Sequence, residues 1–352
     1  MKIFMRQCAF QKGYFFKMLI CFGILFSLSA SSYAIGVCTV NKLNTGSLIP
    51  VGFNPRQVIA GDLDSDGAPD MVVISGSSSG STNTATVLLN NMRGSFTSFN
   101  SISFNFTVSG ATLADFNQDG TLDLAVAGTN SSGSSGTSSL VIYFNNGNGV
   151  FSTQNTFTFQ GSVTGLATGD FNSDGAVDIA LSNSSGNNFG TVTVFLNNNF
   201  GNFNLAGNFS VGGVPRAIAV ADFNGDGTQD VVTINTNATG SILSGNGAGN
   251  FQVATNFVVT TNSSSFFQVA LAVGDLNNDN RPDLVVAGGD SNTFFTLLNN
   301  GGGFSNSVQT TFPSFDFRPR SIAIGQVIGD GNVDIVIAGS GSLATPSAQR
   351  QF

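Results

Sequence analysis

Short apolar runs of three to five residues recur along the chain, separated by polar stretches rich in Gly, Ser and Asn. One unit opens with the small-residue run 58–61, passes through a polar loop to the run 71–74, and reaches a third run that ends at 88–91. A more polar segment, such as 156–159 in the next unit, alternates apolar and polar residues. Runs of this length bounded by turn residues predict β-strands. No convincing helix follows residue 34, so we expect an all-β fold.

The unit repeats six times, with its polar loop beginning at residues 62, 115, 170, 222, 275 and 326. Four antiparallel strands in each of several units are typical of a β-propeller. The small residues of the first strand suit a crowded inner edge, and the 34 Phe residues are expected to be wedges between blades. We expect the propeller to span residues 35–345, followed by a short tail, 346–352.

Six units leave the blade number open between six blades and an incomplete seven. The last unit has too few residues after position 341 for two more strands. We expect residues 37–54 to supply the missing outer strands of the sixth blade and so to close the ring. A truncated ring of seven blades is the alternative.

The polar loop of each unit is acidic and nine residues long. The chain has 20 acidic residues, all of them Asp, and 18 lie in the six loops. Acids that served only solubility would be scattered and would include Glu. Their common register instead indicates a common role, and the chemistry of that role is calcium binding.

Calcium takes six to eight oxygen ligands in a tolerant geometry. Side chains at loop positions 1, 3, 5 and 9 and the carbonyl of position 7 could supply them. Position 6 is Gly, or Asn280, as a turn with positive φ requires. We expect the side chain at position 7 not to matter. The predicted ligands are Asp62, Asp64, Asp66, Ala68 and Asp70; Asp115, Asn117, Asp119, Thr121 and Asp123; Asp170, Asn172, Asp174, Ala176 and Asp178; Asp222, Asn224, Asp226, Thr228 and Asp230; Asp275, Asn277, Asp279, Arg281 and Asp283.

The loops differ in predicted affinity. The first carries four Asp and is expected to bind calcium most tightly, because ligand charge raises affinity. The sixth has Gln326 and Ile328 at positions 1 and 3, so Asp330 and Asp334 are predicted to form a weak or empty site. Position 12 falls in an apolar strand, which excludes an EF-hand. The alternative is that Asp, Asn and Gly here are only turn residues.

These residues resemble the FG-GAP or VCBS repeats, the family of the integrin α-chain propeller and of many secreted bacterial surface proteins. The resemblance rests on the loop 115–123 and its copies, and on the element 145–151, and it covers about residues 50–340. It implies a propeller, commonly of seven blades, with Ca²⁺ on one face and partners on the other.

Residues 1–34 are expected to be a secretory signal with a basic start, an apolar stretch at 18–28 and small residues before the cleavage point. An uncleaved anchor is the alternative. Removal takes four basic residues and no acids, which leaves 8 basic residues against 20 Asp, a net charge of −12. This charge argues against nucleic-acid and anionic membrane partners. After cleavage, Cys38 would be the one remaining Cys. Its thiol is expected to be inert, or to be lipidated if residues 35–38, which faintly resemble a bacterial lipobox, serve as one.

Catalytic residue types are scarce. The chain has no His and no Glu, and Lys42, Tyr143 and Cys38 are single after residue 34. Asp290 and Asp316, outside the loops, are a weak carboxylate pair for a glycosidase. A lectin is a second alternative, although the chain has no Trp. We therefore expect a secreted calcium-binding module with no enzymatic activity, bound to an extracellular protein or surface polysaccharide.

Three Pro-Arg pairs stand at the same place in their units, just before the first strand. Arg56, Arg216 and Arg320 would lie on the face opposite the acidic loops. They are predicted either to form a basic rim for an acidic partner, or to pack over the blade and pair with Asp. The Ser- and Gly-rich loops 75–84 and 127–139 would share that face as binding loops or loose connections.

Overall fold

The computed structural model describes residues 25–29, 32–36, 49–76, 83–92, 95–130, 136–185, 190–261, 269–288, 293–304, 307–312, 318–326 and 333–340. Every regular element in these residues is a β-strand. The expectation of an all-β chain is confirmed for this part of the protein. Within it, no helix is long and apolar enough to cross a membrane.

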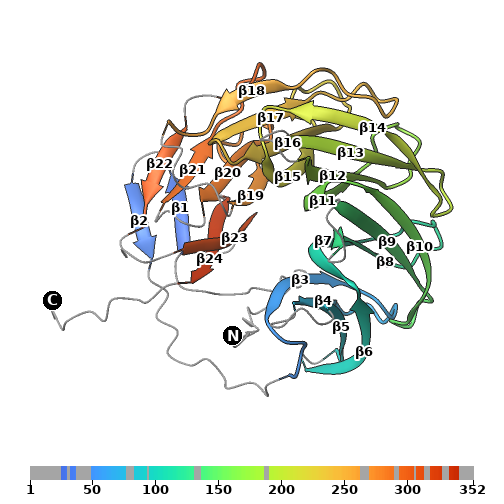
Figure 1. Ribbon diagram of the computed structural model, residues 1–352. Helices are drawn as coiled ribbons and strands as arrows, with labels where there is room; N and C mark the ends of the chain where they lie inside the picture. Colours follow the sequence, from blue (N-terminus) through green and yellow to red (C-terminus); the bar gives the residue numbers. More distant parts are fainter. Residues whose placement is uncertain are drawn as a thin grey trace, which may run out of the picture.

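Five four-stranded antiparallel sheets, named blades 1 to 5, each use four consecutive strands (Figure 1). Blade 1 is β3 (Pro55–Gly61), β4 (Asp70–Ser75), β5 (Asn83–Asn90) and β6 (Phe96–Phe104); blade 2 is β7 (Phe106–Ala114), β8 (Asp123–Asn130), β9 (Thr137–Asn145) and β10 (Phe151–Gln160); blade 3 is β11 (Ser162–Gly169), β12 (Asp178–Ser184), β13 (Gly190–Asn197) and β14 (Phe203–Val211); blade 4 is β15 (Pro215–Ala221), β16 (Asp230–Asn235), β17 (Thr239–Leu243) and β18 (Thr255–Val258); blade 5 is β19 (Val269–Gly274), β20 (Asp283–Gly288), β21 (Thr293–Leu297) and β22 (Val308–Thr311).

The two ends of the chain meet in a further sheet. β23 (Arg318–Gly325) and β24 (Asp334–Ser340) are joined by β1 (Leu25–Ser29) and β2 (Ser32–Gly36), in the order β2-β1-β24-β23. We expected residues 37–54 to pair here, and that is wrong for 49–54. Ile49 and Val51 instead pack on blade 1 against Met71, Val73 and Leu88, because this blade face has no other blade to cover it. Residues 37–48 lie outside the described residues.

The blades surround a common centre, with the first strand of each nearest to it (Figure 1). Successive inner strands pack against each other from β3 through β7, β11, β15 and β19 to β23. The second strand of each of blades 1 to 5 is buried along most or all of its length. In blades 2 to 5 a sheet covers it on either side, and in blade 1 Ile49 and Val51 cover the face that no other blade covers. The fold is therefore a β-propeller of four-stranded blades.

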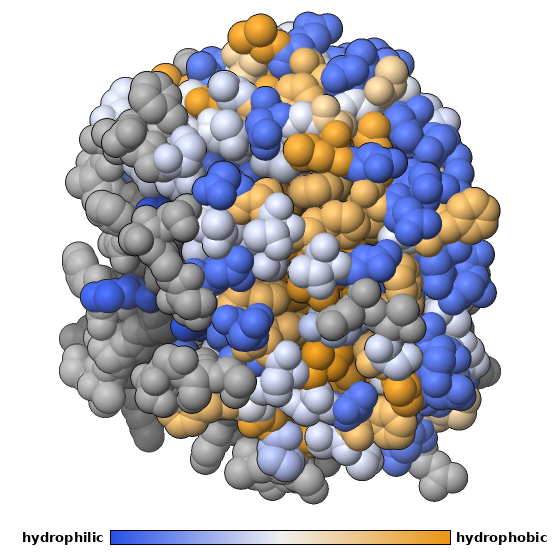
Figure 2. All heavy atoms as spheres, turned by 45° about the vertical axis from the view of Figure 1, so that its right-hand side comes forward, coloured by the Kyte–Doolittle hydropathy of each residue, from blue (hydrophilic) through white to orange (hydrophobic). Residues whose placement is uncertain are grey.

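The hydrophobic core consists of layers between consecutive blades, whereas polar and apolar residues are mixed on the surface that Figure 2 shows. One layer joins blades 1 and 2, and others join blades 2 and 3, 3 and 4, 4 and 5, and blade 5 and β23–β24. The Phe at loop position 2 meets the Phe that ends a turn of the next blade, with ring centroids 5.7 Å apart for Phe116 and Phe203 and 5.4 Å apart for Phe171 and Phe251. The expected Phe wedges are confirmed at these positions.

Candidate metal centres

All five described acidic loops lie on one face of the propeller. Each follows the end of an inner strand and leads into the second strand of the same blade. Because the inner strands neighbour each other and the blades share one strand order, their carboxyl ends point to the same side. The face thus carries loop 1 (62–70), loop 2 (115–123), loop 3 (170–178), loop 4 (222–230) and loop 5 (275–283).

Each loop curls around its first Asp. The N–H of position 6 donates to that carboxylate in every one of the five, as Gly67 does to Asp62 Oδ2 at 2.9 Å and Asn280 to Asp275 Oδ2 at 2.8 Å. Position 6 has a positive φ, +85° at Gly67 and +63° at Asn280, as predicted. Position 4 also has a positive φ, with Ser65 at 61° and Gln118 at 59°, which the sequence did not reveal because these residues are not Gly.

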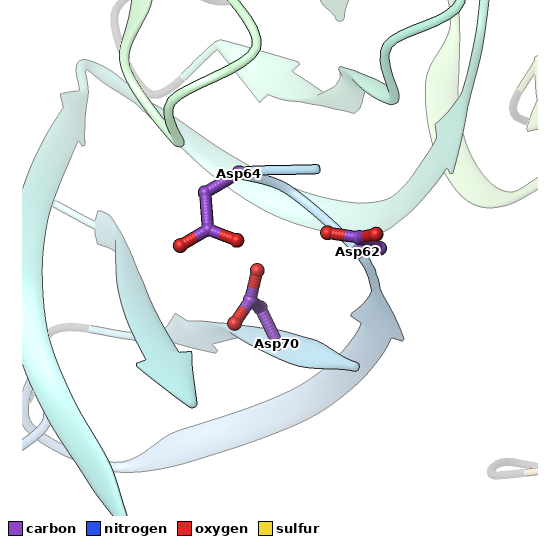
Figure 3. Close-up of side chains that lie close together, drawn as sticks. All are labelled: Asp62, Asp64 and Asp70. Carbon is purple, nitrogen blue, oxygen red and sulfur yellow. The ribbon is translucent and has the colours of Figure 1, made fainter. Parts of the chain in front are cut away.

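Loop 1 brings three carboxylates together. One oxygen from each of Asp62, Asp64 and Asp70 lies within 4.8 Å of the others, and Figure 3 shows the three side chains facing a shared space. Asp62 Oδ1 is buried and accepts no hydrogen bond from the described residues. Asp66 is turned to the N–H of Ala68, at 2.8 Å. A buried acceptor beside two more carboxylates is costly without a cation, so this donor set fits calcium.

Loops 2 to 5 satisfy more of their oxygens internally. The first Asp accepts the N–H of position 5 through Oδ1, for example Asp119 N to Asp115 at 3.1 Å. The Asn at position 3 donates its Nδ2 to the Asp at position 5, for example Asn117 to Asp119 at 2.9 Å. Loop 1 has Asp64 at position 3 and cannot make this bond. The oxygen-rich, preformed curl still fits calcium, but with fewer charges than loop 1.

The Asp at position 9 has a second role that the sequence did not predict. Its Oδ2 accepts the N–H of position 2, and its Oδ1 accepts the N–H of the residue that ends the third strand or follows it. In blade 3, Asp178 accepts Phe171 N at 2.9 Å and Asn197 N at 2.7 Å. The same pair recurs in each of the other four loops. Position 9 therefore fastens the loop to the third strand.

Burial raises the pKa of the position-9 carboxylates. Each position-9 Asp is fully buried, and burial raises the pKa of Asp123 and of Asp178 to about 6 against the opposing hydrogen bonds from backbone N–H groups. Burial also raises the pKa of Asp70, Asp230 and Asp283. At the exposed position 5, hydrogen bonds from Thr228 lower the pKa of Asp226. Burial thus opposes the ionised form of the position-9 carboxylates, and a nearby cation would favour it.

The side chain at position 7 matters, contrary to expectation. Thr121 Oγ1 donates to Asp119 Oδ1 at 2.6 Å, and Thr228 Oγ1 donates to Asp226 at 2.6 Å. In loop 5, Arg281 Nη2 lies 2.5 Å from Asp279 Oδ2, while its Nε donates to Asn299 O at 2.9 Å. A tightly curled loop brings position 7 back over position 5, so the side chain at position 7 can contact an expected calcium ligand. Loop 5 consequently has a guanidinium on one of its expected calcium ligands.

The sequence of these loops matches a known family model. The model, an FG-GAP-like repeat, matches residues 62–126, 115–181, 183–233, 222–286 and 275–337, together more than half of the chain. The chain belongs to the FG-GAP-like repeat family. The resemblance to FG-GAP repeats is thereby confirmed, and four of the five matches begin at the first residue of an acidic loop.

Two solved structures of one protein share the overall fold of this chain. BBS1N in complex with ARL6DN, in crystals soaked with lead, has a TM-score of 0.54 at 14% identity over 83% of this chain and 78% of that one. The mercury-soaked crystal gives 0.53 at 13% identity, over 82% and 78%. The V. cholerae biofilm matrix protein Bap1 has a TM-score of 0.45 at 16% identity, over 78% of this chain and 41% of that one. No curated protein matches the chain in sequence.

The remaining predicted residues of this FG-GAP chain fall in three places. Asp334 is buried in the sixth copy, whereas Asp330 lies outside the described residues, as do Asp290, Asp316 and Cys38. Arg56, Arg216 and Arg320 each stand at a β-bulge where the register of the inner strand shifts. They share one structural position, at the opposite end of the strand from the acidic loops.

The surroundings of two of these arginines are clear. The Arg56 guanidinium lies against the backbone of Gly76, so close that a Cβ there would be 2.6 Å from Nε. Arg216 Nε is buried without a hydrogen-bond acceptor among the described residues. Within those residues no ion pair joins Arg56 or Arg216 to an Asp. Arg56 therefore packs over the blade, as one of the two alternatives predicted. Among the described residues it does not form the ion pair with Asp that the same alternative included.

Proposed function

We propose that this protein is a secreted, calcium-binding propeller that acts as a binding or adhesion module for an extracellular protein or matrix partner. The observation that carries the proposal is loop 1, where Asp62, Asp64 and Asp70 converge around a buried oxygen without a hydrogen-bond donor. Four more loops with the same curl support about five Ca²⁺ sites. Calcium supplies there the positive charge that joins the loop carboxylates. The proposal assigns no catalytic residue.

The blade number belongs to the same proposal. Five blades are built from consecutive strands, and β23 and β24 supply half of another sheet with N-terminal strands beside them. We propose a ring of six blades. Its last blade is shared between the two ends of the uncleaved chain; after cleavage at Ala34, which removes β1, residues from 35 onward would have to supply its outer strands. Such sharing fastens a ring, because opening it would break strand pairing as well as packing.

Secretion rests on the pattern of residues 1–34. The predicted cleavage after Ala34 would remove β1 and the start of β2 (Ser32–Gly36). Sequencing the N-terminus of the exported protein tests this directly. The proposal predicts Ile35 as the first residue. An exported protein that retains Leu25 would contradict cleavage and would keep β1 paired with β24.

The partner is proposed to be a protein on the face opposite the acidic loops. BBS1N, a protein of the same fold, was crystallised with a protein, ARL6DN, which supports a protein-binding use of such a propeller. The bulge positions of Arg56, Arg216 and Arg320 give this face its positive charge. An acidic protein surface is the complement of that rim.

Binding of the fluorescently labelled protein to the surface of the producing cells tests the partner proposal. We expect calcium-dependent, saturable binding that a triple variant, Arg56→Gln, Arg216→Gln and Arg320→Gln, weakens strongly. Thermal unfolding and bound calcium are measured in the triple variant as the control, and both should match those of the unaltered protein. Equal binding by the triple variant and the unaltered protein would overturn the rim, and no binding at all would overturn the adhesion role.

A further inference from the structure

A hollow of about 350 Å³ opens between blades 2 and 3, on the face of the acidic loops. It lies where loop 2, the end of β9 and the turn before β14 meet. Its lining combines two aromatic rings with amide, carboxylate and hydroxyl groups. The lining residues that carry the argument are Asn117, Asp119, Phe144, Asn146, Ser152 and Phe200.

The walls of this hollow are held by hydrogen bonds across blades. Gln118 Nε2 donates to Gly175 O at 3.3 Å and to Asn199 Oδ1 at 3.0 Å, which ties loop 2 to loop 3 and to the turn. Asn155 Nδ2 donates to Gly201 O at 2.9 Å and ties the same turn to β10. The hollow is therefore formed before any ligand arrives, which lowers the entropic cost of binding.

The turn before β14 packs closely on the ring of Phe144 because residue 201 is glycine. Gly201 has a φ of +70°, and a Cβ there would lie 2.3 Å from the ring of Phe144. The turn can adopt this position only because residue 201 lacks a side chain. The close approach fixes Phe144 beneath the hollow and leaves Phe200 projecting at its edge.

The combination of Gln118 and Phe200 occurs between blades 2 and 3 and does not recur between the other described blades. Position 4 of the other described loops is Ser65, Ser173, Gly225 or Asn278, none as long as Gln118. The place of Phe200 in the turn is taken by Asn148, Ala248 or Gly302 in blades 2, 4 and 5. Phe200 is 73% exposed and is one of seven residues that line the hollow, which is what separates it from other exposed apolar residues such as Phe53. A requirement of the fold would recur in every blade, and this ring does not.

The chemistry of the lining selects the ligand class. No Lys or Arg lines the hollow, and Asp119 would repel an anion. A purely apolar side chain would strip water from Asn117, Asn146 and Ser152 without offering hydrogen bonds in return. A neutral sugar has an apolar C–H face for the rings of Phe144 and Phe200 and hydroxyl groups for the polar rim. The volume is at the small end of the range for ligand pockets, about 300–1,000 Å³.

We propose that this hollow binds one or two units of a neutral saccharide, with Phe200 as the stacking residue and Asn117, Asn146 and Ser152 as hydroxyl partners. Asn117 and Asp119 are also expected ligands of loop 2. Calcium in that loop would neutralise Asp119 and stiffen the rim, and this part of the inference rests on the proposed function. The stacking surface itself does not depend on calcium.

Saturation-transfer NMR on the purified protein tests the site, with glucose, galactose, mannose and N-acetylglucosamine as probes. We expect saturable binding of at least one sugar, weakened roughly tenfold or more in Phe200→Ala. Phe53→Ala is the matched control, because Phe53 is similarly exposed, at 69%, but does not line the hollow. Equal thermal unfolding of the two variants excludes a folding defect as the cause.

Two outcomes would overturn the proposal: no saturable binding of any of the four sugars, or equal affinity in Phe200→Ala and the unaltered protein. Each titration is run with calcium and after its removal, with bound calcium counted in the same sample. Bound calcium without sugar binding would refute the saccharide site alone. Sugar binding that needs Phe200 in a protein with no bound calcium would keep the site and refute the calcium role.

Discussion

Asn145 Nδ2 donates to the carbonyl oxygen of Leu63, 82 residues earlier and one blade away, at 2.8 Å. The same side chain donates to Leu122 O at 3.1 Å within its own blade. Asn197 and Asn299 repeat the bond, to Phe116 O and Phe223 O. The first Asn of the Asn-Asn element thus joins the end of one blade to the acidic loop of the preceding blade.

Replacing Asn145 by Ala should destabilise the protein by about 1–3 kcal/mol, because one buried and one half-buried carbonyl group lose their donor. Urea unfolding measures the effect. Asn146→Ala is the matched control. Its side chain is exposed and makes only a local bond to Asn148 N, so the expected change is below about 0.5 kcal/mol. Equal losses in the two variants would mean that the inter-blade bond contributes nothing specific.

The two roles of the loop carboxylates can be separated in loop 3. Asp178→Asn places an amide NH₂ against a backbone N–H and should lower stability by about 1–3 kcal/mol even without calcium. Asp174→Asn, at the exposed position 5, should leave the calcium-free stability almost unchanged and weaken calcium binding. Unfolding in chelator and calcium titration of both variants test this. A calcium-free stability that is the same for both would contradict the fastening role of Asp178.

The calcium-free protein should lose stability as pH rises from about 4 to about 6. Burial raises the pKa of Asp123 and Asp178 from 3.8 to about 6, so the folded chain holds protons in this window that the unfolded chain has released. Bound calcium favours the ionised carboxylates and should flatten or reverse the trend. Thermal unfolding of dialysed, calcium-free protein at several pH values checks it. Stability that rises with pH in the absence of calcium would contradict the account.

Calcium removal should affect the loops unequally. Loop 1 holds four Asp with no internal cation, whereas the Arg281 guanidinium lies on Asp279 in loop 5. We expect hydrogen exchange to rise most in residues 62–70 and least in residues 275–283 when a chelator is added. Exchange measured by mass spectrometry resolves the two segments. In Arg281→Ala, loop 5 should become as sensitive as the others, and an unchanged response there would refute the role of Arg281.

Most of the architecture could be predicted from the sequence because the repeat is local. The positions of Asp62 and Asn280 within a nine-residue turn fix the curl, and the strands on either side have their own apolar pattern. The contact between Asn145 and Leu63 could not be predicted, since it depends on how neighbouring blades are placed. The pairing of β1 with β24 joins the two ends of the chain, and no local pattern specifies it. The Thr121 hydroxyl was overlooked because its contact with Asp119 requires the folded curl.

If calcium stabilises this propeller as we propose, thermal unfolding with bound calcium counted in the same sample will show it. We expect about five ions per chain and a large rise in stability over the chelated protein. Each site filled at ten to a hundred times its dissociation constant should contribute roughly 1.4–2.7 kcal/mol. No bound calcium and no change in the unfolding temperature would mean that the loops are only turns, and would contradict the account.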